Sequence, residues 1–301
     1  MTQQTNASEN KSNLIKPYKV ACIGAGKMLT ALIGGMIDQG YDPQHIMATR
    51  RDADALQALS ERFAIQVSDD NHYAASWADV IILGVKPLQF AELLSGLSET
   101  CQSRLIISVM AGVDTGKLKS CLNHATENTF DDWAIVRAMP NLPCQLSQGV
   151  TGLFADDRVS IEQKKWTEQL FAALGVVLWL SDEAKMHALT VISGSGPAYF
   201  FLLQEYLVAF AMRQGFSQQE AETLVNHTAA GAVNMLRKSE LSQTESGQAD
   251  HSAKALRAMI SSPGGVTEKV ISTLEQDQLQ QIWQQALSAG CLHSEGMAER
   301  E

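Results

Sequence analysis

The sequence predicts an α/β protein in which a doubly wound parallel sheet is followed by an all-helical part. Short apolar runs alternate with helix-length segments as far as residue 180, and this order is typical of parallel sheets with helices on both faces. Strand patterns disappear after Asp182, where long helical patterns take over. A glycine-rich turn at Gly24 and Gly26 joins the first predicted strand to the first predicted helix. These three observations together indicate the fold class.

The predicted strands are short, and several are continuously apolar, as expected when helices cover both faces of a sheet. They lie at residues 18–23, 45–49, 80–85, 105–109 and 135–139. The helical segments between them lie at residues 27–39, 54–62, 87–97 and 115–121. Two more apolar runs, 150–154 and 176–180, flank an amphipathic segment at 161–174. We expect these two runs to extend the same sheet.

Helical patterns fill the rest of the chain. They lie at residues 183–192, 196–214, 217–238, 251–260, 266–275 and 277–296. The stretch from Lys238 to Asp250 is rich in Ser, Gln and Glu, so we predict a surface loop there. The expected organisation is a disordered polar tail at 1–16, a sheet domain at 17–181 and a helical domain at 182–301.

Composition excludes several classes of protein. Asp and Glu outnumber Lys and Arg by 33 to 23, giving a net charge of −10, whereas nucleic-acid binding needs a basic surface. The most apolar stretch, 197–212, contains Gln204 and Glu205 and is too short and polar to span a membrane. The five cysteines lack CxxC spacing and the seven histidines lack ligand spacing. We therefore expect a cytoplasmic protein with reduced thiols, no metal site, no nucleic-acid partner and no membrane contact.

The turn after the first strand has features of a dinucleotide site. Gly24 permits a tight turn, and Gly26 removes a side chain where a pyrophosphate must approach the backbone. Leu29 occupies the third glycine position, so the fingerprint is incomplete. Lys27 has two interpretations, because it either neutralises part of the pyrophosphate or points to solvent.

The end of the second strand indicates the type of cofactor. An NAD site usually has an acidic residue there, but this chain has Thr49, Arg50 and Arg51. A guanidinium can bind a 2′-phosphate through paired, charge-assisted hydrogen bonds, and the Thr49 hydroxyl can add another. The alternative is that both arginines are solvated charges before a helix capped by Asp52. We predict NADP(H), with NAD(H) as the alternative cofactor.

Two later segments place small residues and a proline directly before helical runs. They are residues 191–199 and 260–267, and both allow a ligand to approach a helix N-terminus, which favours anions. With the glycine turn, they suggest an enzyme that holds a small carboxylate beside a nicotinamide. For Pro263, Gly264 and Gly265 the alternative is a helix–helix turn. The segment from Ser193 to Gly196 is not GxSxG, so we favour close helix packing over a hydrolase site.

At these residues the chain resembles the pyrroline-5-carboxylate reductase family, over residues 18 to about 290. The resemblance rests on five motifs. They are Ile23-Gly24-Ala25-Gly26-Lys27-Met28, Gly84-Val85-Lys86-Pro87, Arg137-Ala138-Met139-Pro140-Asn141, Ser193-Gly194-Ser195-Gly196-Pro197-Ala198-Tyr199 and Ser262-Pro263-Gly264-Gly265-Val266-Thr267.

The resemblance implies a Rossmann-type domain followed by an all-α dimerisation domain, with dimers that assemble further into decamers. It implies an active site between the two domains, close to the dimer interface. The reaction would be hydride transfer from NAD(P)H to the imine carbon of 1-pyrroline-5-carboxylate. The product would be L-proline, made in the last step of proline biosynthesis.

The resemblance also assigns residues to the two ligands. For the cofactor they are Gly24, Ala25, Gly26, Lys27 and Met28 at the pyrophosphate, Thr49 and Arg50 at the adenosine ribose, Val85, Lys86 and Pro87 at the nicotinamide-side ribose, Ala111 and Gly112 nearby, and Met139, Pro140 and Asn141 along the nicotinamide. For the substrate they are Ser262, Gly264, Gly265, Val266 and Thr267.

The chemistry of the reaction fits these residues. An imine accepts hydride well only when its nitrogen is protonated or hydrogen-bonded, so the site needs positioning, a donor and compensation for the carboxylate. Thr267 can supply the hydroxyl as an orienting donor. The amides around Gly264, Gly265 and Val266 can receive the carboxylate, because glycine allows close approach.

Five positions depart from the family pattern: Lys27, Leu29, Met110, Leu142 and Val266. If Met110 or Leu142 widens the pocket, the substrate would be a six-membered cyclic imino acid. Because Lys27 and Leu29 alter the glycine turn, a dinucleotide-binding regulatory protein without turnover is the alternative from another class.

Overall fold

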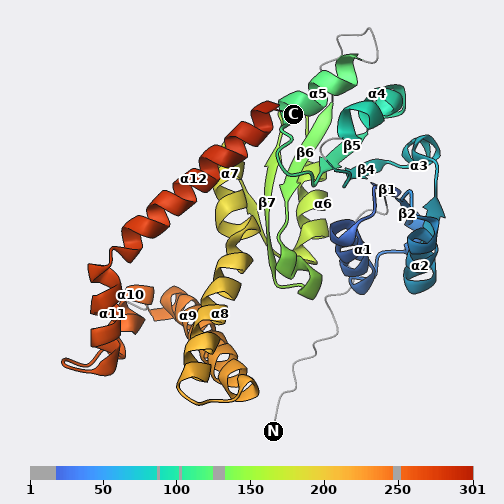
Figure 1. The fold of residues 1–301 in the computed structure, drawn as a ribbon. Coiled ribbons are helices and arrows are strands. Elements are labelled where there is room, and N and C mark those ends of the chain that lie inside the picture. Colours follow the sequence, from blue (N-terminus) through green and yellow to red (C-terminus); the bar gives the residue numbers. More distant parts are fainter. Residues whose placement is uncertain (1–17, 87–88, 102–103, 125–132, 247–251, 301) are drawn as a thin grey trace. The chain divides into compact units, whose positions relative to one another are not determined.

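The computed structural model describes residues 18–86, 89–101, 104–124, 133–246 and 252–300 (Figure 1). The predicted tail at 1–16 and the predicted site residue Pro87 lie outside this part of the chain. The chain forms two compact units, one reaching to Ser195 and including 291–301, the other comprising Gly196–Gly290. The predicted boundary at Ser181–Asp182 lies just after the last described strand, which ends at Trp179.

The described residues of the first unit form one sheet of eight strands (Figure 1). They are β1 Val20–Ile23, β2 Ile46–Thr49, β3 Gln66–Ser68, β4 Val80–Leu83, β5 Leu105–Ser108, β6 Ala134–Met139, β7 Gly149–Ala155 and β8 Gly175–Trp179. Their order is β3-β2-β1-β4-β5-β6-β7-β8. The order changes direction beside β1, and in doubly wound sheets such a switch point marks the ligand site. The doubly wound α/β fold is therefore confirmed.

The pairing of β6 with β7 is antiparallel, and every other neighbouring pair is parallel. The predicted parallel sheet therefore contains one antiparallel pair. The reason is the short connection, which holds one 3-10 turn at Leu142–Leu146, whereas a parallel crossover needs a dozen or more residues. The expected extension of the sheet by two further strands is confirmed as β7 and β8.

In the part of the chain that the structure describes, the two faces of the sheet are covered by α1 Lys27–Asp38, α2 Ala53–Phe63, α3 Asn71–Trp77, α4 Phe90–Cys101, α5 Thr115–His124 and α6 Ile161–Ala172. One core lies between the sheet and α1, α2 and α6, and a second lies between its other face and α3, α4 and α5. Middle strands such as β4 are buried on both faces, which explains their continuous apolar sequence. Sequence patterns missed β3 and α3 because both are short, with three and seven residues.

Polar caps fix where several helices begin. Asp52 accepts a hydrogen bond from Ala55 N at 3.1 Å and begins α2, as predicted. Asp70 begins α3 in the same way, and Ser160 with Gln163 forms a capping box at α6. By contrast, Gly26 begins α1 without a side-chain cap. The first amides of α1 therefore have no side-chain acceptor from the cap residue.

The helical part contains α7 Lys185–Leu189, a π turn at Thr190–Gly194, and α8 to α12. The last five are α8 Gly196–Arg213, α9 Gln218–Ser246, α10 Ala253–Met259, α11 Val266–Gln276 and α12 Leu279–Arg300. The predicted loop from Lys238 was wrong as far as Ser246, which is helical. Glu, Gln, Leu and Ser tolerate a helix, and the first glycine after Lys238 comes only at 247.

Large apolar side chains are exposed along α8, including Phe200, Tyr206 and Phe210. By length and composition alone, the helical run Lys185–Arg213 could cross a membrane, with a mean hydropathy of 1.2 over an 18-residue window, but a single such helix is weak evidence for a span. A partner of this chain's own kind would equally explain such exposure. Within the second unit, Tyr199 and Trp283 pack edge to face with ring centroids 5.5 Å apart.

Candidate active site

The glycine turn lies at the carboxyl end of β1, where doubly wound sheets bind ligands. Gly24 has a φ of +78°, and a Cβ there would lie 2.6 Å from Val85 Cγ1. The amides of Gly24 and Ala25 donate to Thr49 O at 3.1 and 2.8 Å, which fixes the turn against the end of β2. The next residue begins α1 without a side-chain cap. The amide of Gly26 donates to Gly24 O at 2.7 Å, so the turn uses its own amides. The uncapped start of α1 can therefore present backbone amides to an anion such as a pyrophosphate.

Thr49 lies at the end of β2 and is only 1% exposed. Its hydroxyl donates to Asn71 Oδ1 at 2.6 Å, so the proton of Thr49 is already used within the protein. Asn71 is the first residue of α3, which sequence patterns did not detect. The signal that could have revealed it is Asp70, whose carboxylate accepts hydrogen bonds from His72 N and Tyr73 N as a helix cap.

The two arginines after β2 line different cavities. Arg50 Nη1 donates to Ala25 O at 3.4 Å, and Arg50 Nη2 lies 3.7 Å from Asp52 Oδ2. Arg50 lines a cavity of about 480 Å³ that Lys27 also lines. Arg51 instead lines a cavity of about 240 Å³ with Asn71. The structure thus brings Lys27 and Arg50 together beside the glycine turn and places Arg51 elsewhere.

The ends of β4 and β5 supply the next predicted cofactor residues. Val85 is partly buried against Gly24, while Lys86 is exposed. Ala111 is exposed, and Gly112 adopts a left-handed φ of +78° in the loop that follows β5. Met110 is 3% exposed and belongs to the core beneath α3, α4 and α5. Its side chain therefore packs inside the domain.

A partly buried ion pair contacts the start of α5, at the end of this loop. Arg137 of β6 is 3% exposed, and its Nη1 donates to Glu183 Oε1 at 3.2 Å. The same carboxylate accepts hydrogen bonds from Thr115 N at 2.9 Å and Thr115 Oγ1 at 2.6 Å. Glu183 therefore joins β6 to the start of α5. Sequence reasoning missed Glu183, because its partners lie far away along the chain.

Asn141 follows β6, and both the nitrogen and the oxygen of its carboxamide form hydrogen bonds within the protein. Its Nδ2 donates to Ser193 O at 3.1 Å, and its Oδ1 accepts from Val150 N at 2.9 Å. Met139 is partly buried, whereas Pro140 and Asn141 are buried. Leu142, the neighbouring departure from the family pattern, is 50% exposed. Asn141 thus links the strand end to the π turn before α8.

No thiol at this edge of the sheet is activated among the described residues. Burial raises the pKa of the Cys144 thiol, and weak hydrogen bonds to Asn141 and Thr151 offset only part of that effect. A thiol with a raised pKa stays neutral near pH 7 and is a poor nucleophile. The described residues also contain no group of three or more metal-ligating side chains that could hold an ion.

The second small-residue segment forms a turn before α11. Gly264 has a φ of +69°, and a Cβ at Gly265 would lie 2.9 Å from Ser262 O, so both positions favour glycine. Gly264 N donates to Glu268 Oε2 at 2.6 Å, and Gly265 N donates to Ser262 O at 2.9 Å. Val266 is exposed and Thr267 is partly buried. The backbone of this turn therefore already binds one carboxylate of the same chain, that of Glu268.

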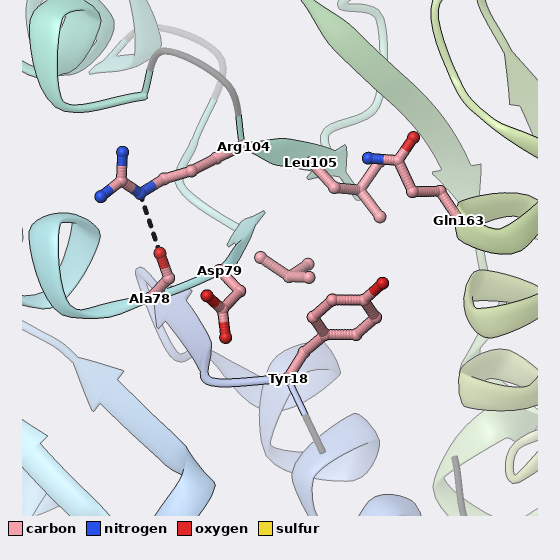
Figure 2. A pocket seen from close by; sticks show the side chains of 7 residues that line it. Tyr18, Ala78, Asp79, Arg104, Leu105 and Gln163 are labelled. Atoms are coloured by element: carbon pink, nitrogen blue, oxygen red, sulfur yellow. Dashed lines mark hydrogen bonds between the residues drawn. The ribbon is translucent and has the colours of Figure 1, made fainter. Parts of the chain in front are cut away.

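A further cavity of about 310 Å³ lies at the opposite edge of the sheet (Figure 2). Its lining includes Tyr18, Asp79 and Arg104, which precede or begin strands. Arg104 Nε donates to Ala78 O at 2.8 Å, as the dashed line in Figure 2 shows. Ligands of doubly wound sheets bind at the carboxyl ends of the strands. This cavity therefore stands apart from the candidate site.

Comparison with known proteins adds independent findings. Residues 183–297 match the family model for pyrroline-5-carboxylate reductase dimerisation. Residues 19–112 match the model for NADP oxidoreductase, coenzyme F420-dependent. The chain is 36% identical over 283 residues to pyrroline-5-carboxylate reductase of Pseudomonas aeruginosa, covering 94% of this chain and 97% of the relative. It is 35% identical over 280 residues to that of Vibrio alginolyticus, covering 93% and 97%.

Comparison with solved structures also finds pyrroline carboxylate reductases. The chain is similar to a pyrroline-5-carboxylate reductase of Coxiella burnetii, with a TM-score of 0.82, 34% identity and coverage of 94% of this chain and 99% of the other. It is also similar to pyrroline carboxylate reductase of Plasmodium falciparum with NADP bound. That match has a TM-score of 0.78, 26% identity and coverage of 94% and 99%.

Proposed function

The chain belongs to the pyrroline-5-carboxylate reductase family, and from this premise we propose that it reduces 1-pyrroline-5-carboxylate to L-proline with NADPH. This reaction is the last step of proline biosynthesis. The observation that carries the proposal is the near full-length likeness to these reductases, 94% of this chain and 97% of the relative in one case. The uncapped glycine turn at the carboxyl end of β1 supports it, because the reaction needs a dinucleotide.

The cofactor residues lie at successive strand ends of the first unit. Gly24, Ala25, Gly26 and Met28 cradle the pyrophosphate, while Lys27 and Arg50 supply positive charge at the cavity they share. Val85, Lys86, Ala111 and Gly112 border the nicotinamide half, and Met139, Pro140 and Asn141 lie along it. NADP(H) is the cofactor, and a related structure holds NADP. Thr49 supports the turn through its backbone carbonyl. Thr49, Arg50 and Arg51 stand at the end of β2, where NAD enzymes usually have an acidic residue.

The substrate residues lie in the turn before α11. Ser262, Gly264, Gly265 and Val266 receive the carboxylate of the ring, because glycine lets it approach the amides of a helix N-terminus. Thr267 orients the ring nitrogen as a hydrogen-bond donor, with water relaying the proton. When bound, the reduced nicotinamide supplies a hydride, which adds to the imine carbon while the nitrogen takes a proton. The C=N double bond becomes the C–N bond of proline.

The assembly we propose is a homodimer formed through the helical part, with further association into decamers. Exposed Phe200, Phe201 and Phe210 on α8 supply the apolar surface that such a dimer needs. The net charge of −10 supports the absence of nucleic-acid partners. The protein acts in the cytoplasm without membrane contact.

One assay tests the proposal. Oxidation of NADPH is followed by its absorbance with five-membered and six-membered cyclic imino acids, and then with NADH in place of NADPH. We expect turnover with the five-membered imine and a lower KM for NADPH than for NADH. Turnover of the six-membered imine alone would instead indicate that the exposed Leu142 widens the pocket. NADP⁺ binding without turnover of either imine would identify a regulatory protein and refute the proposal.

A further inference from the structure

Two side chains of the motif from Arg137 to Asn141 connect residues 183–193 to the sheet at two points. At the first point, the Arg137 guanidinium donates to Glu183 Oε1 at 3.2 Å. Arg137 is 3% exposed, and the side chain of Glu183 is 19% exposed. A charge so deeply buried must be paired, so this contact strongly constrains both side chains.

Glu183 also contacts the residue that ends the loop after β5. It accepts hydrogen bonds from both the amide and the hydroxyl of Thr115, at 2.9 and 2.6 Å. Thr115 is the first residue of α5, so the carboxylate also lies at a helix N-terminus, where negative charge is favoured. The loop that contains Ala111 and Gly112 is therefore held at its end by Glu183.

At the second point, Asn141 holds the π turn. The amide of Ser195 donates to Thr190 O at 2.8 Å, five residues back, so the usual α-helical pairing is shifted here. Asn141 Nδ2 donates to Ser193 O, and Asn141 Oδ1 accepts from Val150 N of β7. One carboxamide therefore joins the end of β6, the start of β7 and the π turn.

Between these points, α7 packs closely on β7. A Cβ at Gly152 would lie 2.4 Å from Leu189 Cδ1, so the leucine occupies space that only glycine leaves open. Leu189 is 9% exposed. Three contacts thus fix residues 183–193 along the same edge of the sheet that carries the candidate cofactor site.

We propose that Arg137 and Asn141 are positioning residues for hydride transfer. Arg137 acts through Glu183 and Thr115 on the loop at Ala111 and Gly112, and Asn141 acts through the π turn. Because the carboxamide of Asn141 is used at both ends, its side chain influences the nicotinamide through the backbone it holds. The inference rests on the proposed function, since it assigns these residues a part in NADPH-dependent reduction. A misplacement of about 1 Å can cost about 100-fold in rate.

The test uses the full-length protein with Glu183→Gln, Asn141→Ala and Thr115→Val, and with Thr115→Ser as the conservative rescue. Glu168→Gln is the matched control, because the Glu168 carboxylate accepts a hydrogen bond from Trp179 Nε1 at 3.1 Å on an exposed surface. For each variant, kcat and KM for NADPH are measured per NADP⁺-binding site. The deuterium isotope effect with 4,4-dideuterated NADPH and the melting temperature are measured on the same samples.

We expect kcat/KM per site to fall at least tenfold in Glu183→Gln and Asn141→Ala, with an isotope effect no smaller than that of the unmodified protein. Thr115→Val should lose at least fivefold, and Thr115→Ser should recover most of it. Losses below fivefold in all three variants, with only the melting temperature lowered, would overturn the inference. If Glu183→Gln does not fold, the comparison of Thr115→Val with Thr115→Ser decides whether the inference holds.

Calorimetric titration with NADP⁺ separates this inference from the proposed function. If the unmodified chain does not reduce the imine, the proposed function fails on its own. The positioning role then predicts an NADP⁺ affinity at least fivefold weaker in Thr115→Val than in Thr115→Ser. Equal affinities would overturn the role independently of turnover.

Discussion

The side chain of Leu29 occupies the space that a side chain at Gly84 would need. A Cβ at Gly84 would lie 2.6 Å from Leu29 Cδ1 and 2.7 Å from Leu29 Cγ. Leu29 stands where dinucleotide fingerprints have their third glycine, whose usual role is close packing of the helix on the sheet. Here the glycine lies on the facing strand end instead, and the leucine lies on the helix. The incomplete fingerprint therefore still gives a closely packed turn.

The Leu29–Gly84 contact predicts a strong coupling between the two positions. Gly84→Ala should destabilise the protein by about 1–3 kcal/mol through overpacking, and Leu29→Ala by about 2–5 kcal/mol through a cavity. The double variant should lose less than the sum, because the new methyl group fills part of the cavity. Urea unfolding of the four proteins measures the coupling. Additive losses within about 0.5 kcal/mol would show that the two residues act separately.

Cofactor preference should depend on Arg50 far more than on Arg51. Arg50 shares a cavity with Lys27 beside the glycine turn, whereas Arg51 lines another cavity. Loss of charge-assisted hydrogen bonds worth about 1.5–3 kcal/mol would raise KM for NADPH by about 10- to 150-fold in Arg50→Ala. KM for NADH should change little, because NADH lacks the 2′-phosphate. An unchanged NADPH/NADH preference in Arg50→Ala, or an equal loss in Arg51→Ala, contradicts this prediction.

Thr267 should matter for catalysis more than for folding. Thr267→Ala removes the proposed donor to the ring nitrogen and should lower kcat by about 10- to 1000-fold. Thr267→Ser keeps a hydroxyl and should retain most of the activity. Steady-state kinetics with the five-membered imine measures both variants. A loss of less than twofold in Thr267→Ala would exclude the role.

The carboxylate of Glu268 should compete with the substrate. It accepts a hydrogen bond from Gly264 N at 2.6 Å, at one of the amides proposed to receive the ring carboxylate. Glu268→Ala frees this amide and removes a nearby negative charge, so KM for the imine should fall severalfold while KM for NADPH stays constant. Kinetics at varied imine concentration checks this. A higher KM for the imine would mean that Glu268 supports the turn.

Buried thiols should make the protein sensitive to alkaline pH. Burial raises the pKa of Cys22 from an ordinary value of 9.0 to about 12. Above pH 9 the unfolded chain therefore loses a proton that the folded chain keeps, so stability is complete below pH 9 and declines as pH rises towards 12. Each such thiol contributes a loss of about 1.4 kcal/mol per pH unit in that window.

Urea unfolding of the unmodified protein and Cys22→Ala at pH 8 and at pH 10.5 measures this effect. The variant carries a packing penalty at pH 8, and that penalty should shrink at pH 10.5 because alanine does not titrate. Cys101→Ala should behave alike, since burial raises the pKa of Cys101 to about 12 as well. A penalty that is the same at both pH values would be inconsistent with a buried neutral thiol.

Much of the fold could be predicted because its signals are local. β4 and β5 are buried on both faces, and their continuously apolar sequences predict this burial. The glycine turn and the cap at Asp52 also depend on neighbouring residues alone. The predictions failed where a pattern was too short, as in α3, or where composition misled, as in the helix that continues to Ser246.

The candidate site was predictable only in part. Motifs supplied the residues at each strand end, but the pairing of Arg137 with Glu183 joins positions 46 residues apart. No local pattern encodes such a contact. Likewise, residue type alone does not distinguish Arg50 from Arg51, whereas the cavities that they line do.

The sequence by itself determined the fold class, the glycine turn and the residue types available for a cofactor and a carboxylate. These properties follow from hydrophobic periodicity and backbone freedom, which act over a few residues. Tertiary structure alone decided that Glu183 pairs with Arg137 and Thr115, that Asn141 holds the π turn and that Leu29 faces Gly84. The physical reason is that buried charges, amides and close packing are satisfied only when distant segments meet.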